Sequence, residues 1–356
     1  MKLALVHDWL NTLGGAERVL IELHKTFPQA PIYVLFYDKR FVRQWLPDAA
    51  VHASFLQKIP FITRIYPMLA LLMPIAIESF DLSHFDRVIS SSVTFSKGLV
   101  LKPSTKHICY CYSPARFLWD RHAEYINGRE YPWLTRISQH LLRLWDYSAA
   151  DRADHFVAIS EAVKDRIGKY YRKEATVIYP PATLTARPEK IVPHQDFYLI
   201  VSRLYDYKNI RLAIETFNKL GYPLVIIGDG PDRRALEREA KKNIVFLGAR
   251  DDATLASYYN ACRAFIMPQE EDFGLTPVEA MQFGKPVVAL RKGGALETVV
   301  EGRTGEFFDD AIPEAMADAI GRLNARYTSY YPTEIKEHAK QFSAERFKAA
   351  IMQVLQ

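Results

Sequence analysis

The sequence predicts an α/β protein built from two doubly wound parallel sheets. Short runs of β-branched and apolar residues alternate with longer stretches of helical periodicity, and this alternation occurs in two series along the chain. Alternating strands and helices favour parallel sheets covered by helices. The chain has 356 residues, of which 49% are hydrophobic, and this is enough for two domains with separate cores.

The first series of strands indicates an N-terminal domain over residues 1–182, and the second a C-terminal domain over residues 196–340. Between them, a proline-rich stretch without periodicity predicts a linker over residues 183–195. The last segment, 341–356, has an N-cap serine and helical periodicity, so we expect a helix that crosses back over both domains. The predicted strands are Leu3–Val6, Ile32–Leu35, Val88–Ser91, Ile108–Tyr112, Phe156–Ile159, Val177–Tyr179, Tyr198–Val201, Leu224–Ile227, Val245–Leu247, Ala264–Met267 and Val287–Leu290.

The composition is that of a globular protein with a mild excess of positive charge. A net charge of +5 suits anionic small molecules or an anionic membrane surface, and is too small to indicate nucleic acid. Three cysteines give no disulfide framework, and Met1 and Lys2 lead directly into an apolar strand without a signal peptide, so we expect a cytoplasmic protein. Cys109 and Cys111 should share one face of a strand, and no second Cys/His pair accompanies them, so we expect no metal site there.

The segment from Gln269 to Pro286 reads QEEDFGLTPVEAMQFGKP and joins an acidic loop to the start of a helix. Free N–H groups at a helix start bind anions, so we expect those between Glu271 and Glu279 to face a phosphate. The two carboxylates suit hydroxyl groups instead, and a ligand with both parts is a sugar nucleotide. Two structural interpretations remain open: a capping box from Thr276 to Glu279, and a solvated acidic loop.

A second set of charged residues follows the predicted strand Tyr198–Val201. Arg203 and Lys208 are five positions apart in a loop and can converge on one anion, Arg as a planar fork and Lys as a point charge. Two cations suit a diphosphate. The alternative is that one of them only pairs with Asp206 or another surface carboxylate.

Glycines recur where strands give way to loops. The first predicted strand is followed by His7, Asp8 and Trp9, and then by Gly14 and Gly15, which open a helix. We expect this junction between strand and helix to contact a phosphate or sugar. Gly228 lies in a Gly-Asp-Gly-Pro loop that favours a turn. The pair at Gly293 should place a flexible backbone near the same ligand.

Together and in this order, these pieces resemble family 4 retaining glycosyltransferases of the two-Rossmann-domain type called GT-B, and in particular bacterial surface-polysaccharide hexosyltransferases. The resemblance covers nearly the whole chain. It implies two Rossmann-like domains that face a central cleft, with the acceptor bound by the N-terminal domain and a nucleotide sugar by the C-terminal one. The matching pieces are Gly14-Gly15-Ala16-Glu17, Ser202-Arg203 with Lys208, Gly228-Asp229-Gly230-Pro231, EEDFGLTPVEAM around Glu271 and Glu279, and GGALETV from Gly293.

The resemblance also implies roles for individual residues. Arg203 and Lys208 would hold the donor's diphosphate, Glu271 would lie by the sugar hydroxyls as the third catalytic residue, and Glu279 would bind the ribose. The remaining donor contacts implied are Gly14, Gly15, Tyr112, Gly228, Phe273, Gly274, Leu275 and Thr276, with Gly15 completing the diphosphate pocket on closure. No Asp-x-Asp element is present, so we expect transfer without a metal or other cofactor.

One segment departs from the family. In the run from His107 to Asp120, Tyr112 occupies a position where relatives that add mannose commonly have a histidine that touches the donor sugar. Tyrosine still donates a hydrogen bond but is bulkier and stays neutral near pH 7, so the sugar is not carried over from those relatives. We expect Asp8, Arg116 and Asp120 near the acceptor or the transferred sugar.

Two apolar regions bear on the acceptor. The stretch Tyr66–Ile77 is too short and too rich in proline to span a bilayer, so it is either a buried helical hairpin or a surface that dips into a membrane beside Lys58 and Arg64. The helix around Trp133 to Trp145 carries two arginines that could face anionic lipid.

The residues and the family resemblance together imply a retaining, metal-independent hexosyltransferase that uses a UDP- or GDP-sugar and a growing, lipid-linked glycan at the cytoplasmic membrane face. The alternatives are a non-hydrolysing sugar-nucleotide epimerase, which needs acid/base residues around C2 of the sugar, and a noncatalytic sugar-nucleotide-binding protein.

Overall fold

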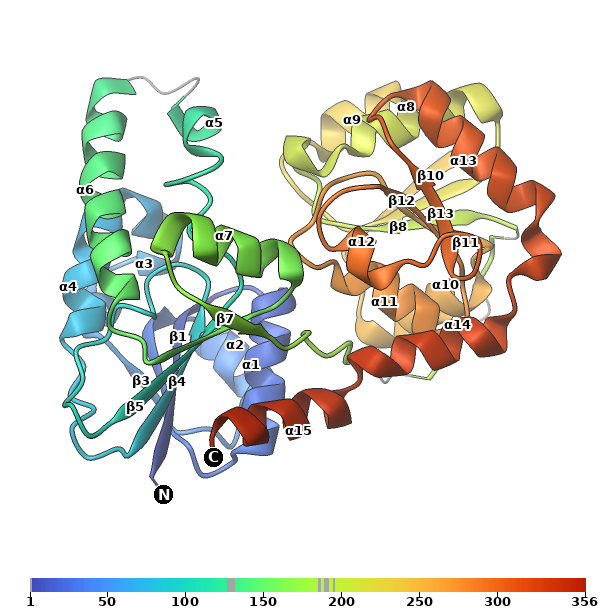
Figure 1. The fold of residues 1–356 in the computed structure, drawn as a ribbon. Coiled ribbons are helices and arrows are strands. Elements are labelled where there is room, and N and C mark those ends of the chain that lie inside the picture. The colour runs from blue at the N-terminus through green and yellow to red at the C-terminus, as the bar shows by residue number, and fades with distance from the viewer. Residues whose placement is uncertain (1, 127–131, 185–186, 189–191, 195) are drawn as a thin grey trace. The chain divides into compact units, whose positions relative to one another are not determined.

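The computed structural model describes residues 2–126, 132–184, 187–188, 192–194 and 196–356. The chain forms two compact units, one of Met1–Tyr179 with Phe347–Gln356 and the other of Pro180–Arg346 (Figure 1). We call them unit 1 and unit 2. Part of the predicted linker, residues 185–186, 189–191 and 195, lies outside the described residues.

Unit 1 contains a seven-stranded sheet with the order β3-β2-β1-β4-β5-β6-β7, in which all neighbouring strands are parallel. Pairs such as Leu5 with Ile32 on one side and Ile89 on the other fix the register of the central strand. The strands are β1 Leu3–Leu10, β2 Ile32–Tyr37, β3 Val51–Ala53, β4 Arg87–Ser92, β5 Lys106–Cys111, β6 His155–Ala158 and β7 Ala175–Val177.

Several helices of unit 1 bury an apolar face against this sheet. The helix α1 contributes Val19, Leu20 and Leu23, whereas α4 and α6 close a core over β1, β2 and β4 with Met73 and Leu142 among others. The helices are α1 Gly15–Thr26, α2 Lys39–Trp45, η1 Phe55–Lys58, α3 Ile62–Ile65, η2 Tyr66–Leu72, α4 Met73–Glu78, α5 His122–Ile126, α6 Pro132–Ala150 and α7 Glu161–Tyr171.

A buried ion pair ties α6 to the loop after β4. The Lys97 ammonium is 1% exposed and donates to the Asp146 carboxylate and to the Thr94 carbonyl. The other Asp146 oxygen accepts from Trp119 Nε1 and from the Tyr171 hydroxyl, each at 2.8 Å. Because a buried charge is costly unless it is paired and hydrogen-bonded, this network fixes how α6 lies on the unit.

Unit 2 contains a six-stranded parallel sheet with the order β10-β9-β8-β11-β12-β13. Its strands are β8 Tyr198–Val201, β9 Leu224–Ile227, β10 Ile244–Gly248, β11 Ala264–Met267, β12 Val287–Leu290 and β13 Gly305–Phe308. Its helices are η3 Asp206–Lys208, α8 Ile210–Leu220, α9 Arg233–Glu239, α10 Asp252–Ala261, α11 Leu275–Gln282, α12 Ala295–Thr298, α13 Pro313–Ala325, η4 Tyr327–Ser329, α14 Pro332–Ala339 and η5 Lys340–Phe342.

Helix starts and ends in both units follow local chemistry. Ser160 caps α7 by accepting from the Val163 N–H at 3.1 Å, and Asp251 caps α10 by accepting from the Thr254 N–H at 2.8 Å. Gly221 ends α8 with a φ of +73°. The predicted fold class, two doubly wound α/β sheets, is confirmed.

The last helix, α15 (Ala344–Val354), returns the chain to unit 1. Phe347 packs edge-on against Tyr110 of β5, with ring centroids 5.6 Å apart, and Arg87 at the start of β4 donates to the Gln356 carbonyl at 3.3 Å. The C-terminal ten residues are thus part of the packing of unit 1.

Candidate functional site

Each sheet has a point where the strand order reverses, and loops at the carboxyl ends of the two strands there form the usual ligand site of such folds. In unit 2 this point lies between β8 and β11, which are hydrogen-bonded neighbours. The loop after β8 carries Arg203 and Lys208, and the loop after β11 carries Glu271. The topology alone therefore explains why residues about sixty positions apart meet.

Lys208 and Glu271 form an ion pair, with Lys208 Nζ 2.5 Å from Glu271 Oε1. Gln269 donates to the same oxygen at 2.8 Å. Arg203 is exposed and lies close enough to act electrostatically on Glu271, while one of its terminal nitrogens donates to the Tyr207 hydroxyl at 3.2 Å. The structure thus brings together the three residues that were predicted to be catalytic.

The electrostatics of this cluster favour an ionised Glu271. Burial by itself raises the pKa of this carboxyl, but the charge of Lys208, the hydrogen bonds from Gln269 and Lys208, and the charge of Arg203 together outweigh burial and lower the pKa. The cluster holds two cations for one glutamate. Arg203 and Lys208 are therefore the two groups of this cluster that can bind an anionic ligand.

The helix α11 begins beside this cluster. Its N-cap is Gly274, whose φ of +89° is a conformation that favours glycine, and the first helical residue is Leu275. Thr276 therefore lies inside the first turn, the cap has no side-chain hydrogen bond, and the capping box proposed from Thr276 to Glu279 is not formed. The N–H groups of the first turn have no partner within the helix, as expected for an anion-binding end.

Glu279 and Phe273 occupy the inner side of this segment. Glu279 is 5% exposed, and one of its carboxylate oxygens accepts from the Tyr259 hydroxyl at 2.9 Å. Phe273 is buried and packs edge-on against Phe342, with ring centroids 5.4 Å apart. The Phe273 side chain, predicted as a donor contact, therefore packs in the interior of unit 2, and only its backbone remains at the turn.

The glycine loops hold the site together by close backbone packing. A Cβ on Gly228 would lie 1.8 Å from the Ser202 carbonyl oxygen, and one on Gly294 would lie 2.3 Å from Phe273 backbone atoms. The Gly294 N–H also donates to the Glu271 carbonyl at 2.9 Å. Gly228, predicted as a donor contact, thus supports the loop that carries Arg203, and the Gly293–Gly294 pair supports the backbone of Glu271.

The corresponding junction of unit 1 joins β1, β4 and β5 to the start of α1. The Gly14 N–H donates to a carboxylate oxygen of Glu17 at 2.8 Å, and Gly15 is the first residue of the helix. The Tyr112 hydroxyl donates to the Ala16 carbonyl at 2.9 Å and lies 2.8 Å from the Ser91 hydroxyl. Tyr112 therefore fixes the glycine loop, and burial raises the pKa of its hydroxyl well above the ordinary value.

A buried histidine extends this network. His7 Nδ1 lies 2.9 Å from the Ser91 carbonyl and 3.0 Å from its hydroxyl, while Nε2 lies 3.6 Å from Glu17. Glu17 was named in a matching piece of the family resemblance and Ser91 at the end of a predicted strand, but neither of them was assigned a role in the site from the sequence. The spacing Gly14-x-x-Glu17, an N-cap followed by glutamate at the third helical position, was the signal that could have indicated Glu17.

Asp8 has a different role from the one predicted. The prediction that His7, Asp8 and Trp9 follow the first strand is wrong, because β1 runs to Leu10. The Asp8 carboxylate is fully buried and accepts from four backbone N–H groups and one hydroxyl, all in the segment from Val93 to Ser96. Its oxygens are fully used by the loop after β4, so we assign Asp8 to positioning that loop and not to the acceptor.

Arg116 and Asp120, the other two residues expected near the acceptor, form an ion pair with each other. Arg116 Nε donates to an Asp120 oxygen at 3.0 Å, and Arg166 of α7 lies 3.9 Å from the same oxygen. All three side chains are partly exposed. This pair lies on the loop after β5, in unit 1.

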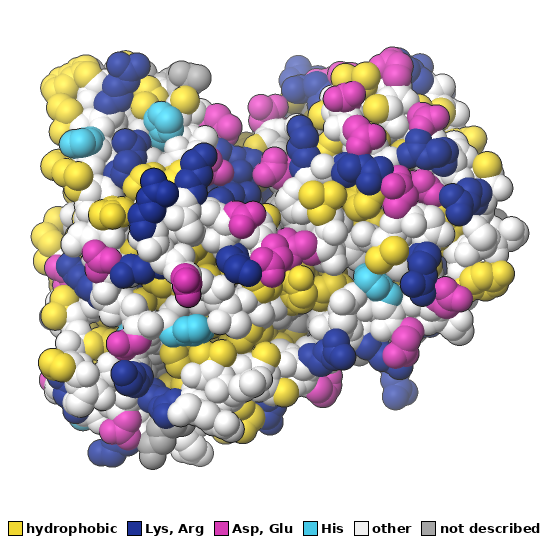
Figure 2. Space-filling view, viewed as in Figure 1, with side chains coloured by type: hydrophobic (Ala, Val, Ile, Leu, Met, Phe, Trp, Pro, Cys, Tyr) yellow, Lys and Arg dark blue, Asp and Glu magenta, His cyan; other side chains and the backbone are white. Residues whose placement is uncertain are grey.

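Unit 1 also exposes two groups of large apolar side chains. On α6, one face is buried against the core, and an exposed strip runs along the helix (Figure 2). A second exposed group spans η1 to α4, where buried Met73 and Ile77 alternate with exposed Met68 and Ile75. The stretch Tyr66–Ile77 is therefore neither a fully buried hairpin nor a free surface. The α6 strip consists of Trp133, Leu134, Ile137, Leu141, Leu144 and Tyr147.

Two family models together match nearly the whole chain. Residues 13–185 match the model described as Glycosyltransferase Family 4, and residues 184–355 match the model described as Glycosyl transferases group 1. The chain belongs to glycosyltransferase family 4. It is a glycosyltransferase of glycan biosynthesis.

Similar proteins agree with this assignment. The chain is 23% identical to alpha-1,3/1,6-mannosyltransferase alg2 of Schizosaccharomyces pombe, over 86% of this chain and 70% of the relative. It is 26% identical to the uncharacterized glycosyltransferase MJ1178 of Methanocaldococcus jannaschii, over 58% of this chain, and the match spans only 60% of that relative's length. Among solved structures, HepE of Anabaena in complex with UDP has a TM-score of 0.72 at 18% identity, covering 100% of this chain and 99% of HepE. The two-unit fold of this family member is GT-B.

Two further observations concern the surroundings of the site. Across the part of the chain that the structure describes, no helix combines the length and hydropathy needed to cross a bilayer. Within those same residues, no three His, Cys, Asp or Glu side chains gather as a metal ion would require.

Proposed function

We propose that this glycosyltransferase moves a hexose, with retention of configuration and without a metal ion, from a UDP- or GDP-sugar to a growing glycan carried by a membrane lipid. The observation that carries the donor half is the cluster of Arg203, Lys208 and Glu271 beside the start of α11. Support for a nucleotide sugar also comes from the solved neighbour HepE, which binds UDP and UDP-glucose.

In this proposal, the cations act on charge that develops during the reaction. The bond between the sugar C1 and the diphosphate oxygen breaks, and the diphosphate gains negative charge. Arg203, Lys208 and the N–H groups of α11 stabilise this charge more strongly in the transition state than in the ground state. Fixed cations can fill the place that a divalent ion takes in other transferases.

The acceptor hydroxyl attacks C1 from the face that the diphosphate leaves, so the configuration at C1 is retained. The acceptor proton passes to an oxygen of the leaving phosphate, and no protein nucleophile is needed. Glu271 accepts hydrogen bonds from hydroxyls of the donor sugar, and Glu279, buried beside Tyr259, binds the ribose.

The acceptor half of the proposal has its own support. The exposed strip of α6 and the exposed residues of η1 to α4 give unit 1 two apolar surfaces, and both carry basic residues nearby. Such surfaces lie at the boundary between head groups and acyl chains. We therefore propose that unit 1 contacts the cytoplasmic face of a membrane, where the lipid-linked acceptor is found.

The test is incubation of the purified protein with radiolabelled UDP- and GDP-hexoses and a membrane extract that contains lipid-linked glycans. Label in the lipid fraction, resistant to EDTA, is the expected result. An isomerised donor would identify an epimerase, and an unchanged donor that still binds would identify a noncatalytic binding protein. Either outcome contradicts the proposal.

Mutations of the cationic pair test the assignment of residues. Arg203→Ala and Lys208→Ala should each lower turnover by about 10²–10³-fold, the usual cost of removing a group that stabilises developing charge. A matched control is Arg234→Ala, an exposed arginine on α9 of the same unit. Near-normal turnover in both site variants would refute the diphosphate assignment.

A further inference from the structure

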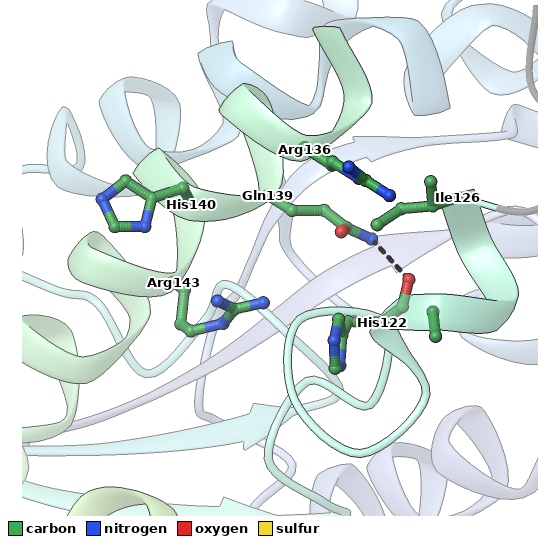
Figure 3. Close-up of a pocket in the computed structure, with 7 residues that line it drawn as sticks. His122, Ile126, Arg136, Gln139, His140 and Arg143 are labelled. Atoms are coloured by element: carbon green, nitrogen blue, oxygen red, sulfur yellow. Dashed lines mark hydrogen bonds between the residues drawn. The ribbon is translucent and has the colours of Figure 1, made fainter. Parts of the chain in front are cut away.

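A cavity of about 420 Å³ opens between α5 and α6 of unit 1 (Figure 3). Two arginines of α6, Arg136 and Arg143, extend from the helix toward α5 on either side of Gln139. His122 and Ile126 of α5 form the opposite wall. This cavity belongs to unit 1, and the donor chemistry described above does not use its residues.

The floor of the cavity is held by hydrogen bonds. Gln139 is buried, and its amide nitrogen lies 2.9 Å from the Phe117 carbonyl and 3.3 Å from the His122 carbonyl. Arg143 donates through Nε to the Leu118 carbonyl at 2.7 Å, and its guanidinium lies 5.8 Å from the centre of the Trp119 ring. Arg143 is thus fixed at its Nε, which leaves its terminal nitrogens for a ligand.

Among the described residues that line this cavity, no carboxylate balances the positive charge. None of the side chains that line it is acidic, and among the described residues neither Arg136 nor Arg143 has an ion-pair partner. Two planar guanidinium forks on one concave surface match the oxygens of a phosphate group. The cavity therefore has the chemistry of a phosphate site.

The position of the cavity on α6 indicates where that phosphate comes from. Leu134, Ile137, Leu141 and Leu144 recur at helical spacing on the exposed strip, with Ile137 and Leu144 each directly after one of the two arginines. A helix that lies in a membrane surface buries its apolar face to the boundary of the acyl chains, and basic residues at the edge of that face reach the phosphates of the head groups. An apolar strip with a cationic cavity at its flank matches both parts of a lipid.

We propose that the cavity lined by Arg136 and Arg143 binds the phosphate group of a lipid embedded in the bilayer, while the α6 strip enters the lipid surface. This inference rests on the membrane contact in the proposed function and adds a specific binding site for one lipid phosphate. It also gives unit 1 a defined orientation on the membrane, because a lipid phosphate bound in the cavity prevents unit 1 from rotating about the axis of α6.

The test measures how strongly the wild type and three double variants bind vesicles of phosphatidylcholine that contain about 30 mol% phosphatidylglycerol, an anionic lipid. Arg136→Gln/Arg143→Gln should bind about thirty-fold more weakly than the wild type, since each basic residue near an anionic surface contributes about five-fold. Arg136→Lys/Arg143→Lys keeps the charge but loses both planar forks, and should still bind about ten-fold more weakly. The control, Lys102→Gln/Lys106→Gln, removes two exposed charges near the amino ends of strands in unit 1 and should stay within about two-fold.

Three results would overturn the proposal. If the lysine variant binds the vesicles as tightly as the wild type, the protein is attracted by its overall positive charge and not by a specific phosphate-binding site. If the control Lys102→Gln/Lys106→Gln loses as much affinity for the vesicles as Arg136→Gln/Arg143→Gln, the same conclusion follows. Displacement of the wild type from vesicles by inorganic phosphate below about 1 mM would assign the cavity to a free anion.

The controls separate this proposal from the proposed function. Unchanged thermal unfolding and unchanged binding of UDP or GDP by the arginine variants show that both units are folded and that the donor site is intact. If the wild type does not bind the vesicles at all, the membrane contact fails together with the cavity assignment. If the wild type binds and the lysine variant binds equally, only the cavity assignment fails.

Discussion

The substitution Glu271→Gln separates two functions of the cluster in unit 2. Glu271 is held by Lys208 at 2.5 Å and by Gln269 at 2.8 Å, so in the empty site it occupies the cation that we assign to the diphosphate. A nucleotide must compete with Glu271 for Lys208. Glutamine has the same shape but lacks the charge, so it weakens this competition. It also replaces the charged acceptor that we assign to the sugar hydroxyls with a neutral amide, which has one acceptor oxygen.

The expected magnitudes follow from the geometry. A hydrogen bond to a charged group contributes about 1.5–3 kcal/mol, and Glu271 is partly exposed, so Glu271→Gln should lower the free energy of unfolding of unit 2 by about 1–2 kcal/mol at pH 7. The sign with pH is fixed by the lowered pKa of Glu271. Its contribution is fully present above the ordinary value of 4.5, and it is lost as the pH falls through the lower value in the folded state. Wild type and variant should therefore converge in stability in acid.

Calorimetric titration with UDP and GDP gives the assay. Glu271→Gln should bind the cognate nucleoside diphosphate as tightly as the wild type or more tightly, whereas Lys208→Met should bind it about ten- to a hundred-fold more weakly, the loss expected for one charged hydrogen bond. Turnover should fall in both variants. A loss of nucleotide affinity in Glu271→Gln as large as that in Lys208→Met would refute the division of roles.

Two further predictions concern the framework. Lys97→Met leaves the buried Asp146 carboxylate without its cation, so it should lower the free energy of unfolding, measured by urea titration, by about 3–5 kcal/mol. The control Lys102→Met, on the surface, should change the free energy of unfolding by less than about 0.5 kcal/mol. Equal changes in the two variants would contradict the buried ion pair. Gly228→Ala places a Cβ 1.8 Å from the Ser202 carbonyl oxygen at a residue whose φ is +139°. We therefore expect nucleotide affinity to fall at least ten-fold, about 1.4 kcal/mol. Unchanged affinity would show that the loop after β8 can shift without consequence.

The sequence was most informative for the central strands of unit 2. The bounds of β8, β9, β11 and β12 were all predicted correctly, because strands buried on both faces are continuous apolar runs. The strands β3 and β13 were missed. β3 has only three residues, none of them fully buried, and β13 begins with Gly305 and the charged Glu306, so neither has a distinct apolar pattern.

The same contrast holds for the candidate site. Arg203, Lys208 and Glu271 could be brought together from the sequence because each follows a strand, and the strands concerned are neighbours in the sheet. The role of Asp8 could not be predicted from the sequence, because the five groups that donate hydrogen bonds to it come from a loop about 85 residues away. A carboxylate that ends its strand and one that is buried within it look alike in sequence, and only the length of β1 separates the two.

The most direct test of the donor site is the preference for a diphosphate over a monophosphate. Calorimetry should show that the wild type binds UDP or GDP about 10²–10⁴-fold more tightly than the matching monophosphate, since two charged hydrogen-bonding groups contribute about 3–6 kcal/mol together. In the double variant Arg203→Ala/Lys208→Ala, this preference should disappear while the monophosphate still binds. A diphosphate preference that persists in the double variant would contradict the assignment of Arg203 and Lys208.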